Sequence, residues 1–122
     1  MLPAPGSDAL LLLHNPRCSK SREAKALLDE RGVAYAERLY LEQPLSRDEL
    51  ADLARRLARP VREWTRTQEP AFASSGLAGG APDAALLDAI ARHPELLERP
   101  VVVRGARAVV GRPPSAILGL LA

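Results

Sequence analysis

Apolar positions along the chain occur first as a short unbroken run and then at the spacing of a helix. Residues 9–13 form a continuous apolar run, which is typical of a strand buried on both faces. Residues 19–31 place apolar side chains at helical spacing, and Gly32 follows as a helix stop. Residues 33–41 carry spaced apolar and aromatic side chains, as in a second strand. The strand–helix–strand order usually makes the two strands parallel neighbours in one sheet.

The central part of the chain predicts helices separated by a long loop. The segment Ser46-Arg47-Asp48-Glu49 is a capping box, which opens a helix. Pro60 suits the start of a further short helix. Residues 68–82 are rich in Pro, Gly, Ser and Ala, so we expect a loop with one turn of helix at most. Asp83 is expected to cap a helix that ends at Arg92.

The last part predicts a hairpin and a closing helix. Residues 101–103 and 108–110 form two short apolar strands, and Gly105-Ala106 between them suits a two-residue turn with glycine in first position. A final helix is expected over 115–121, started by Pro113 or Pro114. The hairpin would add antiparallel strands to the parallel pair.

This order of elements predicts an α/β fold with mixed strand directions. It matches a thioredoxin-like mixed β-sheet flanked by helices, with a helical insert. Residues 1–8 contain Pro, Gly and Ser and are expected to be a flexible N-terminal tail. At 122 residues, the chain fits one domain, which we place at residues 9–122.

Composition narrows the function classes. The formal net charge of +2 does not suggest general nucleic-acid binding, and no apolar run approaches a membrane span. The single cysteine excludes an internal disulfide and a cysteine-rich zinc site, and it points to a reducing compartment. Because residues 1–8 lack the features of a signal peptide, we expect a cytoplasmic protein.

That cysteine, Cys18, lies where the first strand turns into the first helix. A helix N-terminus and nearby cations favour the thiolate, which is the nucleophilic form. A buried, inert thiol is the simpler alternative. A phosphatase-type loop is excluded, because the position six after the cysteine holds Ala24. A self-resolving Cys-x-x-Cys pair is also excluded, because Ser21 takes the second place, so an external thiol must complete any redox cycle.

Nine residues around the cysteine resemble a known active-site motif. The segment His14–Arg22 is similar to the active site of the glutaredoxin-dependent arsenate reductases, a thioredoxin-like family related to Spx-like regulators. Further segments resemble the family in the same order, so the resemblance covers residues 9–121. These segments are Tyr40–Leu50, Arg66–Pro70, His93-Pro94 with Arg99–Val103, and Gly111–Pro113.

The resemblance implies a cysteine-based reduction of arsenate. Cys18 would attack the arsenic of bound arsenate and form a thiol–arsenate adduct, while three arginines hold the oxyanion. Glutathione, as co-substrate, would reduce the adduct, and glutaredoxin would resolve the mixed disulfide with Cys18. Guanidinium groups also fit this task independently, since a tetrahedral oxyanion calls for several convergent donors. The implied arginines are Arg66, Arg99 and Arg112.

The resemblance also implies roles for neighbouring residues. His14, Ser21 and Arg22 would lower the pKa of Cys18 or orient its loop. In thioredoxin-like folds a cis proline precedes a strand that faces the thiol, so we expect Pro100 to be cis. We expect no tightly bound cofactor and no metal. We also expect that the protein is a monomer that binds neither nucleic acid nor a membrane.

Several prominent residues have simpler structural interpretations. Most of the arginines must be solvated, and Arg55 and Arg56 fit a solvated helix face. His93 fits the C-terminal end of a helix, and Trp64 fits core or loop packing.

Two alternative functions stay open from the sequence. The protein could be a glutathione-dependent thiol reductase with another substrate. It could instead be a non-catalytic Spx-like regulator that binds RNA polymerase. Ser21 argues against the Cys-x-x-Cys switch that such regulators often use, and the three arginines argue for an anion site.

Overall fold

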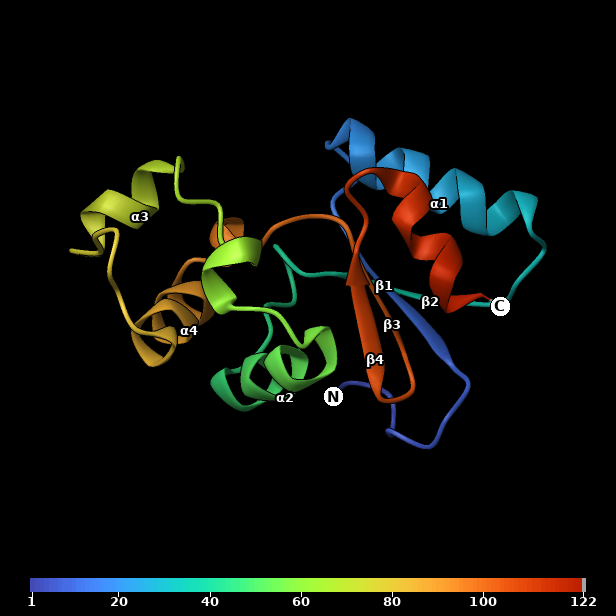
Figure 1. Cartoon of the computed structure of the whole chain (residues 1–122). Coiled ribbons are helices and arrows are strands. Elements are labelled where there is room, and N and C mark those ends of the chain that lie inside the picture. Colours follow the sequence, from blue (N-terminus) through green and yellow to red (C-terminus); the bar gives the residue numbers. More distant parts are fainter. Residues whose placement is uncertain (122) are drawn as a thin grey trace. The chain divides into compact units, whose positions relative to one another are not determined.

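The structure is a computed structural model that describes residues 1–121 (Figure 1). The chain forms two compact units. The first contains residues 1–43 together with the chain from Arg99 onward, and the second contains Pro44–Glu98. No helix of the described residues is long and apolar enough to cross a membrane.

The first unit is built on a four-stranded mixed sheet. Its strands are β1 (Leu10–His14), β2 (Ala36–Leu39), β3 (Val101–Arg104) and β4 (Arg107–Val110), in the order β2-β1-β3-β4. β1 pairs parallel with β2 and antiparallel with β3, and β3 pairs antiparallel with β4. The predicted parallel pair, hairpin and mixed α/β sheet are therefore confirmed.

Two helical segments pack on this sheet. The helix α1 (Ser19–Glu30) and the 3₁₀ helix η3 (Pro114–Leu120) lie side by side in Figure 1. Their apolar side chains join those of β1 and β3 in one buried cluster. Its buried members are Leu10, Leu12, Ala24, Leu28, Val102, Ile117 and Leu120. All five residues of β1 are buried, as predicted for the first apolar run.

Two predicted elements of this unit differ in detail. The second strand covers only Ala36–Leu39 instead of residues 33–41. It is an edge strand, and its ladder ends where β1 ends, at the pair His14↔Leu39. The closing helix begins at Pro114, one of the two prolines predicted to start it, but it is a 3₁₀ helix that ends at Leu120.

The hairpin turn is as predicted, and the start of the chain packs on it. Gly105 has φ +57, so it supplies the left-handed conformation at the first turn position. A Cβ on this glycine would lie 2.9 Å from the carbonyl oxygen of Ser7 and 3.1 Å from that of Pro5. Leu2 is buried as well. Part of residues 1–8 thus lies against the body of the chain, and their flexibility stays a prediction.

The second unit is helical. Its α-helices are α2 (Arg47–Leu57), α3 (Pro70–Ser74) and α4 (Asp83–Arg92), with 3₁₀ helices η1 (Val61–Trp64) and η2 (Pro94–Leu96). The capping box at the start of α2 is confirmed, with both reciprocal bonds present. α3 is the single helical turn expected within the loop.

Two interpretations of side chains in this unit were wrong. Asp83 is the first residue of α4 instead of its cap, which is Pro82. Arg56 is not on a solvated face: it is buried and donates from Nε and Nη2 to the Asp52 carboxylate, at 3.1 and 2.8 Å. Arg56 follows Leu53 by three residues on the buried side of α2, and the carboxylate one turn earlier compensates its charge. Arg55 is exposed as expected.

The structural interpretations of Trp64, as a packing residue, and of His93, as a residue at the end of a helix, are confirmed. Trp64 is fully buried, and its indole N–H points to the carbonyl of Arg59 at 3.4 Å. His93 is the residue that ends α4.

Candidate functional site

Cys18 is the N-cap residue of α1 and is 8% exposed. β1 ends at His14, and the intervening loop is closed by the Cys18 N–H, which donates to the carbonyl of Asn15 at 3.0 Å. The Arg17 N–H donates to the Asn15 side chain, also at 3.0 Å. The loop therefore delivers the sulfur to the end of α1 where backbone N–H groups lack helical partners.

Two arginines from distant parts of the sequence converge on this sulfur. Arg112 Nη2 lies 3.8 Å from Cys18 Sγ. The Nε of Arg112 donates to the carbonyl oxygen of Arg99 at 2.8 Å. The side chain of Arg99 lies near enough to the Cys18 sulfur to lower the pKa of the thiol. The structure thus brings Cys18, Arg99 and Arg112 together within the first unit.

The packing of Gly111 explains how the two arginines meet. The Arg99–Pro100 peptide bond is cis, as predicted, and the Arg112–Pro113 bond is also cis, which was not predicted. The Gly111 N–H donates to the Pro100 carbonyl at 2.8 Å. A Cβ on Gly111 would lie 2.8 Å from Pro100 Cγ and 3.2 Å from Ile117 Cγ2. The lack of a side chain therefore lets the end of β4 lie against Pro100.

The surroundings of Cys18 lower its pKa below the ordinary value of a thiol. Burial is the largest influence and raises the pKa. It is outweighed by hydrogen bonds to the sulfur from the Ser21 N–H, the Arg99 side chain and the Lys20 N–H, together with the charge of Arg99. These donors favour the thiolate, which is the form that attacks an electrophile.

His14 and Ser21 contact each other within the loop. His14 Nδ1 lies 2.7 Å from Ser21 Oγ, and the same oxygen accepts from the Asn15 N–H at 3.0 Å. Ser21 is fully buried. The His14 ring is buried too, and its burial is the main reason that the pKa of His14 is lowered, which favours the neutral imidazole at pH 7. Arg22 donates to the carbonyl of Pro16 at 2.9 Å. From the sequence, His14, Ser21 and Arg22 were expected either to lower the pKa of Cys18 or to orient its loop. These contacts fit the second role.

Arg66 lies in the second unit. Its Nε donates to Glu69 Oε1 at 3.1 Å, and its Nη1 donates to Glu98 Oε1 at 3.2 Å. Neither glutamate was predicted from the sequence as a site residue. The only available signals were the position of Glu69 three residues after Arg66 and that of Glu98 directly before Arg99.

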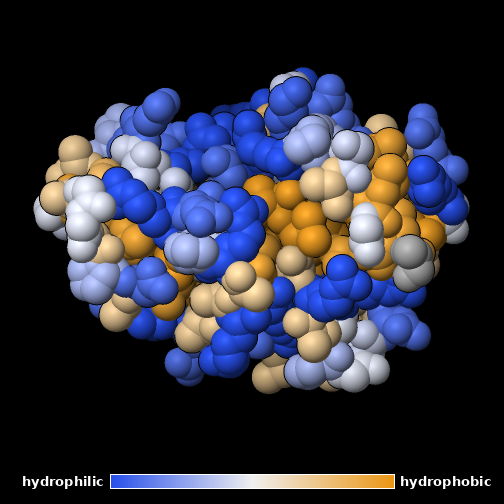
Figure 2. Space-filling view, viewed as in Figure 1, coloured by the Kyte–Doolittle hydropathy of each residue, from blue (hydrophilic) through white to orange (hydrophobic). Residues whose placement is uncertain are grey.

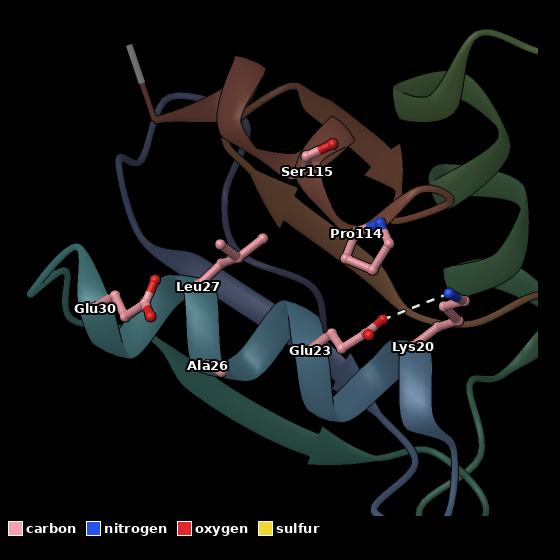
Figure 3. A pocket seen from close by; sticks show the side chains of 7 residues that line it. All are labelled: Lys20, Glu23, Ala26, Leu27, Glu30, Pro114 and Ser115. Atoms are coloured by element: carbon pink, nitrogen blue, oxygen red, sulfur yellow. Dashed lines mark ion pairs between the residues drawn. The ribbon is translucent and has the colours of Figure 1, made fainter.

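A groove of about 430 Å³ runs along α1 and is also lined by the first residues of η3 (Figure 3). Apolar side chains form part of its wall, and Figure 2 shows apolar surface in the region of α1 and η3. Lys20 and Glu23 form an ion pair at its edge, with 3.6 Å between the charged atoms. Cys18 does not line this groove. The lining residues are Lys20, Glu23, Ala26, Leu27, Glu30, Pro114 and Ser115.

Comparison with known proteins identifies the family. The model of the ArsC family matches residues 13–120. The chain belongs to the ArsC family. An arsenate reductase of Haemophilus influenzae is 39% identical over 115 residues, which cover 93% of this chain and 99% of that protein. An arsenate reductase of Neisseria meningitidis is 45% identical over 104 residues, with 84% and 89% covered.

Solved structures place the chain in the same family. The structure named as an arsenate reductase from Vibrio cholerae matches with a TM-score of 0.87 and 39% identity, covering 94% of this chain and 99% of that one. The thioredoxin-like α/β fold is therefore confirmed. The ArsC match includes every residue predicted for the site, from His14 to Arg112.

Proposed function

We propose that this ArsC-family protein is an arsenate reductase, an oxidoreductase that converts arsenate to arsenite. The observation that carries the proposal is the contact of Arg112 Nη2 with the sulfur of Cys18 at the N-terminus of α1, with Arg99 near enough to lower the pKa of the same thiol. Relatives named arsenate reductase, at 39% and 45% identity over most of the chain, support the same function.

The first step is binding of the oxyanion beside Cys18. Arg99 and Arg112 supply planar donors next to the sulfur, and Arg66 is the third ligand that the family resemblance implies. The thiolate of Cys18 then attacks the arsenic atom and forms a sulfur–arsenic bond, while one arsenate oxygen leaves as water. The guanidinium groups stabilise the negative charge on the remaining oxygens.

The second step needs a thiol from outside the chain, since Cys18 is its only cysteine. Glutathione attaches to the arsenic and displaces a second oxygen as water. The two sulfurs then join, so that Cys18 and glutathione are oxidised to a mixed disulfide. The two electrons reduce As(V) to As(III), which takes up one water and leaves as arsenite.

Glutaredoxin completes the cycle by exchange with the mixed disulfide, which returns Cys18 to the thiol. Each turnover begins with a reduced Cys18, so we place the enzyme in the cytoplasm, where thiols are kept reduced. Glutathione acts as a co-substrate, and no tightly bound cofactor takes part.

Arsenate turnover by the purified protein with glutathione and glutaredoxin tests the proposal. Arsenite formation that is lost in the Cys18→Ser variant is the expected result. A parallel pull-down with RNA polymerase tests the regulator alternative. Polymerase binding without arsenite formation would reject the reductase function in favour of a regulator.

A further inference from the structure

The guanidinium group of Arg66 is held on two sides by carboxylates of its own unit. Glu69 binds Nε at 3.1 Å and Glu98 binds Nη1 at 3.2 Å. The Arg66 side chain is 24% exposed, and those of Glu69 and Glu98 are 26% and 22% exposed. By contrast, Arg55, in an ordinary surface ion pair, is 72% exposed. Arg66 is therefore a partly buried arginine whose orientation is determined by two contacts.

The backbone around Arg66 sets up the Glu98 contact. Thr65 and Leu97 form an antiparallel bridge. On either side of it, the Arg66 N–H donates to the Leu96 carbonyl at 2.7 Å, and the Glu98 N–H donates to the Trp64 carbonyl at 3.0 Å. Leu97 and its neighbour Leu96 are buried in the core. This short ladder places Arg66 and Glu98 beside each other although they are far apart in sequence.

The Glu69 contact arises from the turn that leads into α3. The Glu69 N–H donates to the Arg66 carbonyl at 3.2 Å, and Glu69 is the N-cap residue of α3. Its side chain makes no capping bond and binds Arg66 Nε instead. Glutamate is not among the residues that usually cap a helix N-terminus, so the Glu69 carboxylate is available to Arg66.

The geometry points to Glu69 and Glu98 as positioning residues for Arg66. A guanidinium has five N–H donors in a fixed plane. The two contacts use Nε and one hydrogen of Nη1, and among the described residues they leave the Nη2 edge of Arg66 for a ligand. We infer that the two carboxylates hold the Arg66 guanidinium in one orientation before an oxyanion binds. The inference rests on the proposed function, which makes Arg66 an oxyanion ligand.

A variant series at Glu98 tests this inference. Glu98→Ala removes the acceptor, so Arg66 loses its orientation and kcat/KM for arsenate should fall about tenfold. Glu98→Gln keeps an oxygen that accepts from Nη1 and should restore kcat/KM to within about threefold of wild type. In an Arg66→Ala background, Glu98→Ala should cause no further loss, because the group that it positions is already gone.

The exposed pair of Arg59 and Glu63 provides a matched control in the same unit. Its Nε–Oε1 distance is 3.0 Å, and its side chains are about half exposed. Glu63→Ala should leave kcat/KM unchanged, since surface ion pairs contribute little. A loss at Glu98→Ala that persists in the Arg66→Ala background would show a general structural role and overturn the inference. Unchanged activity in Glu98→Ala would overturn it as well.

A second measurement separates this inference from the reductase function. Bound arsenate should protect Cys18 from iodoacetamide, and this readout needs no turnover. Protection in the wild type without arsenite formation would reject the reductase function alone. The inference then requires the same order of protection, with Glu98→Ala weakened and Glu98→Gln restored. Absence of protection in the wild type, or equal protection in all variants, would overturn the inference.

Discussion

Replacement of Arg112 by lysine tests whether the shape of its side chain matters beyond its charge. Arg112 donates from Nε to the Arg99 carbonyl at 2.8 Å, while its Nη2 lies 3.8 Å from Cys18 Sγ. Lysine has a single nitrogen, so in Arg112→Lys one of these two contacts is lost although the positive charge stays. The variant therefore separates planar recognition from simple charge attraction.

The size of the effect follows from the contact that is lost. A hydrogen bond to a charged group contributes about 1.5–3 kcal/mol. At about 1.36 kcal/mol for each factor of ten, kcat/KM for arsenate should fall about 10- to 150-fold in Arg112→Lys. The midpoint of Cys18 alkylation against pH should rise only slightly in the variant, because a cation still lies near the sulfur.

The assay measures arsenite formation with glutathione and glutaredoxin in excess, at several arsenate concentrations. Arg107→Lys is the control, since Arg107 is an exposed residue at the start of β4, the strand that precedes Arg112. The control should keep wild-type kinetics. If Arg112→Lys also keeps wild-type kinetics, then the planar two-point contact of Arg112 has no part in binding the oxyanion, and the reasoning is refuted.

Three further predictions concern the thiol, the resolving step and the packing of the site. The pH midpoint of Cys18 alkylation by iodoacetamide should lie below about 8.5, the value of a free thiol, and a midpoint at or above it would contradict the activation of Cys18. Because the folded pKa is the lower one, the thiolate stabilises the fold above the pKa of the unfolded thiol, and this stabilisation is lost as the pH falls through the folded pKa. Ser21→Cys places a second thiol one helical turn after Cys18, so the variant should depend less on glutaredoxin or be inactivated by an internal disulfide; turnover identical to wild type, with no disulfide by mass spectrometry, would contradict this. Gly111→Ala should lower the free energy of unfolding in urea by about 1–3 kcal/mol through overpacking, and an unchanged urea midpoint would show that Pro100 and Ile117 move away freely.

Local sequence signals were sufficient for most elements of the fold. The capping box at Ser46 and the glycine of the Gly105-Ala106 turn act through local backbone conformation. The start of α2 and the hairpin turn could therefore be predicted from the neighbouring residues alone. The extent of β2 was not readable in this way. β2 ends at Leu39, which pairs with the last residue of β1, His14. The residues of one strand do not show where its partner strand ends.

The candidate site was predictable where a motif is contiguous and not where contacts are distant in sequence. Cys18 and its helix start lie in one segment, so their chemistry followed from nearest neighbours. One of the two carboxylates that bind Arg66 belongs to Glu98, which lies 32 residues away in sequence. The pairing of Thr65 with Leu97 brings Glu98 near Arg66. Burial of Arg56 was missed for a different reason: its partner Asp52 lies only four residues earlier, but that spacing also fits an exposed helix face and does not show which face of α2 is buried.

The mass of the protein after reaction with arsenate and glutathione, in the absence of glutaredoxin, tests the role of Cys18 most directly. We expect that wild-type protein gains one glutathione, that the adduct maps to Cys18, and that it forms only when arsenate is present. Cys18→Ser should gain none, and added glutaredoxin should remove the adduct from the wild type. Absence of an arsenate-dependent adduct, or efficient turnover with thioredoxin as the sole reductant, would contradict the proposed mechanism.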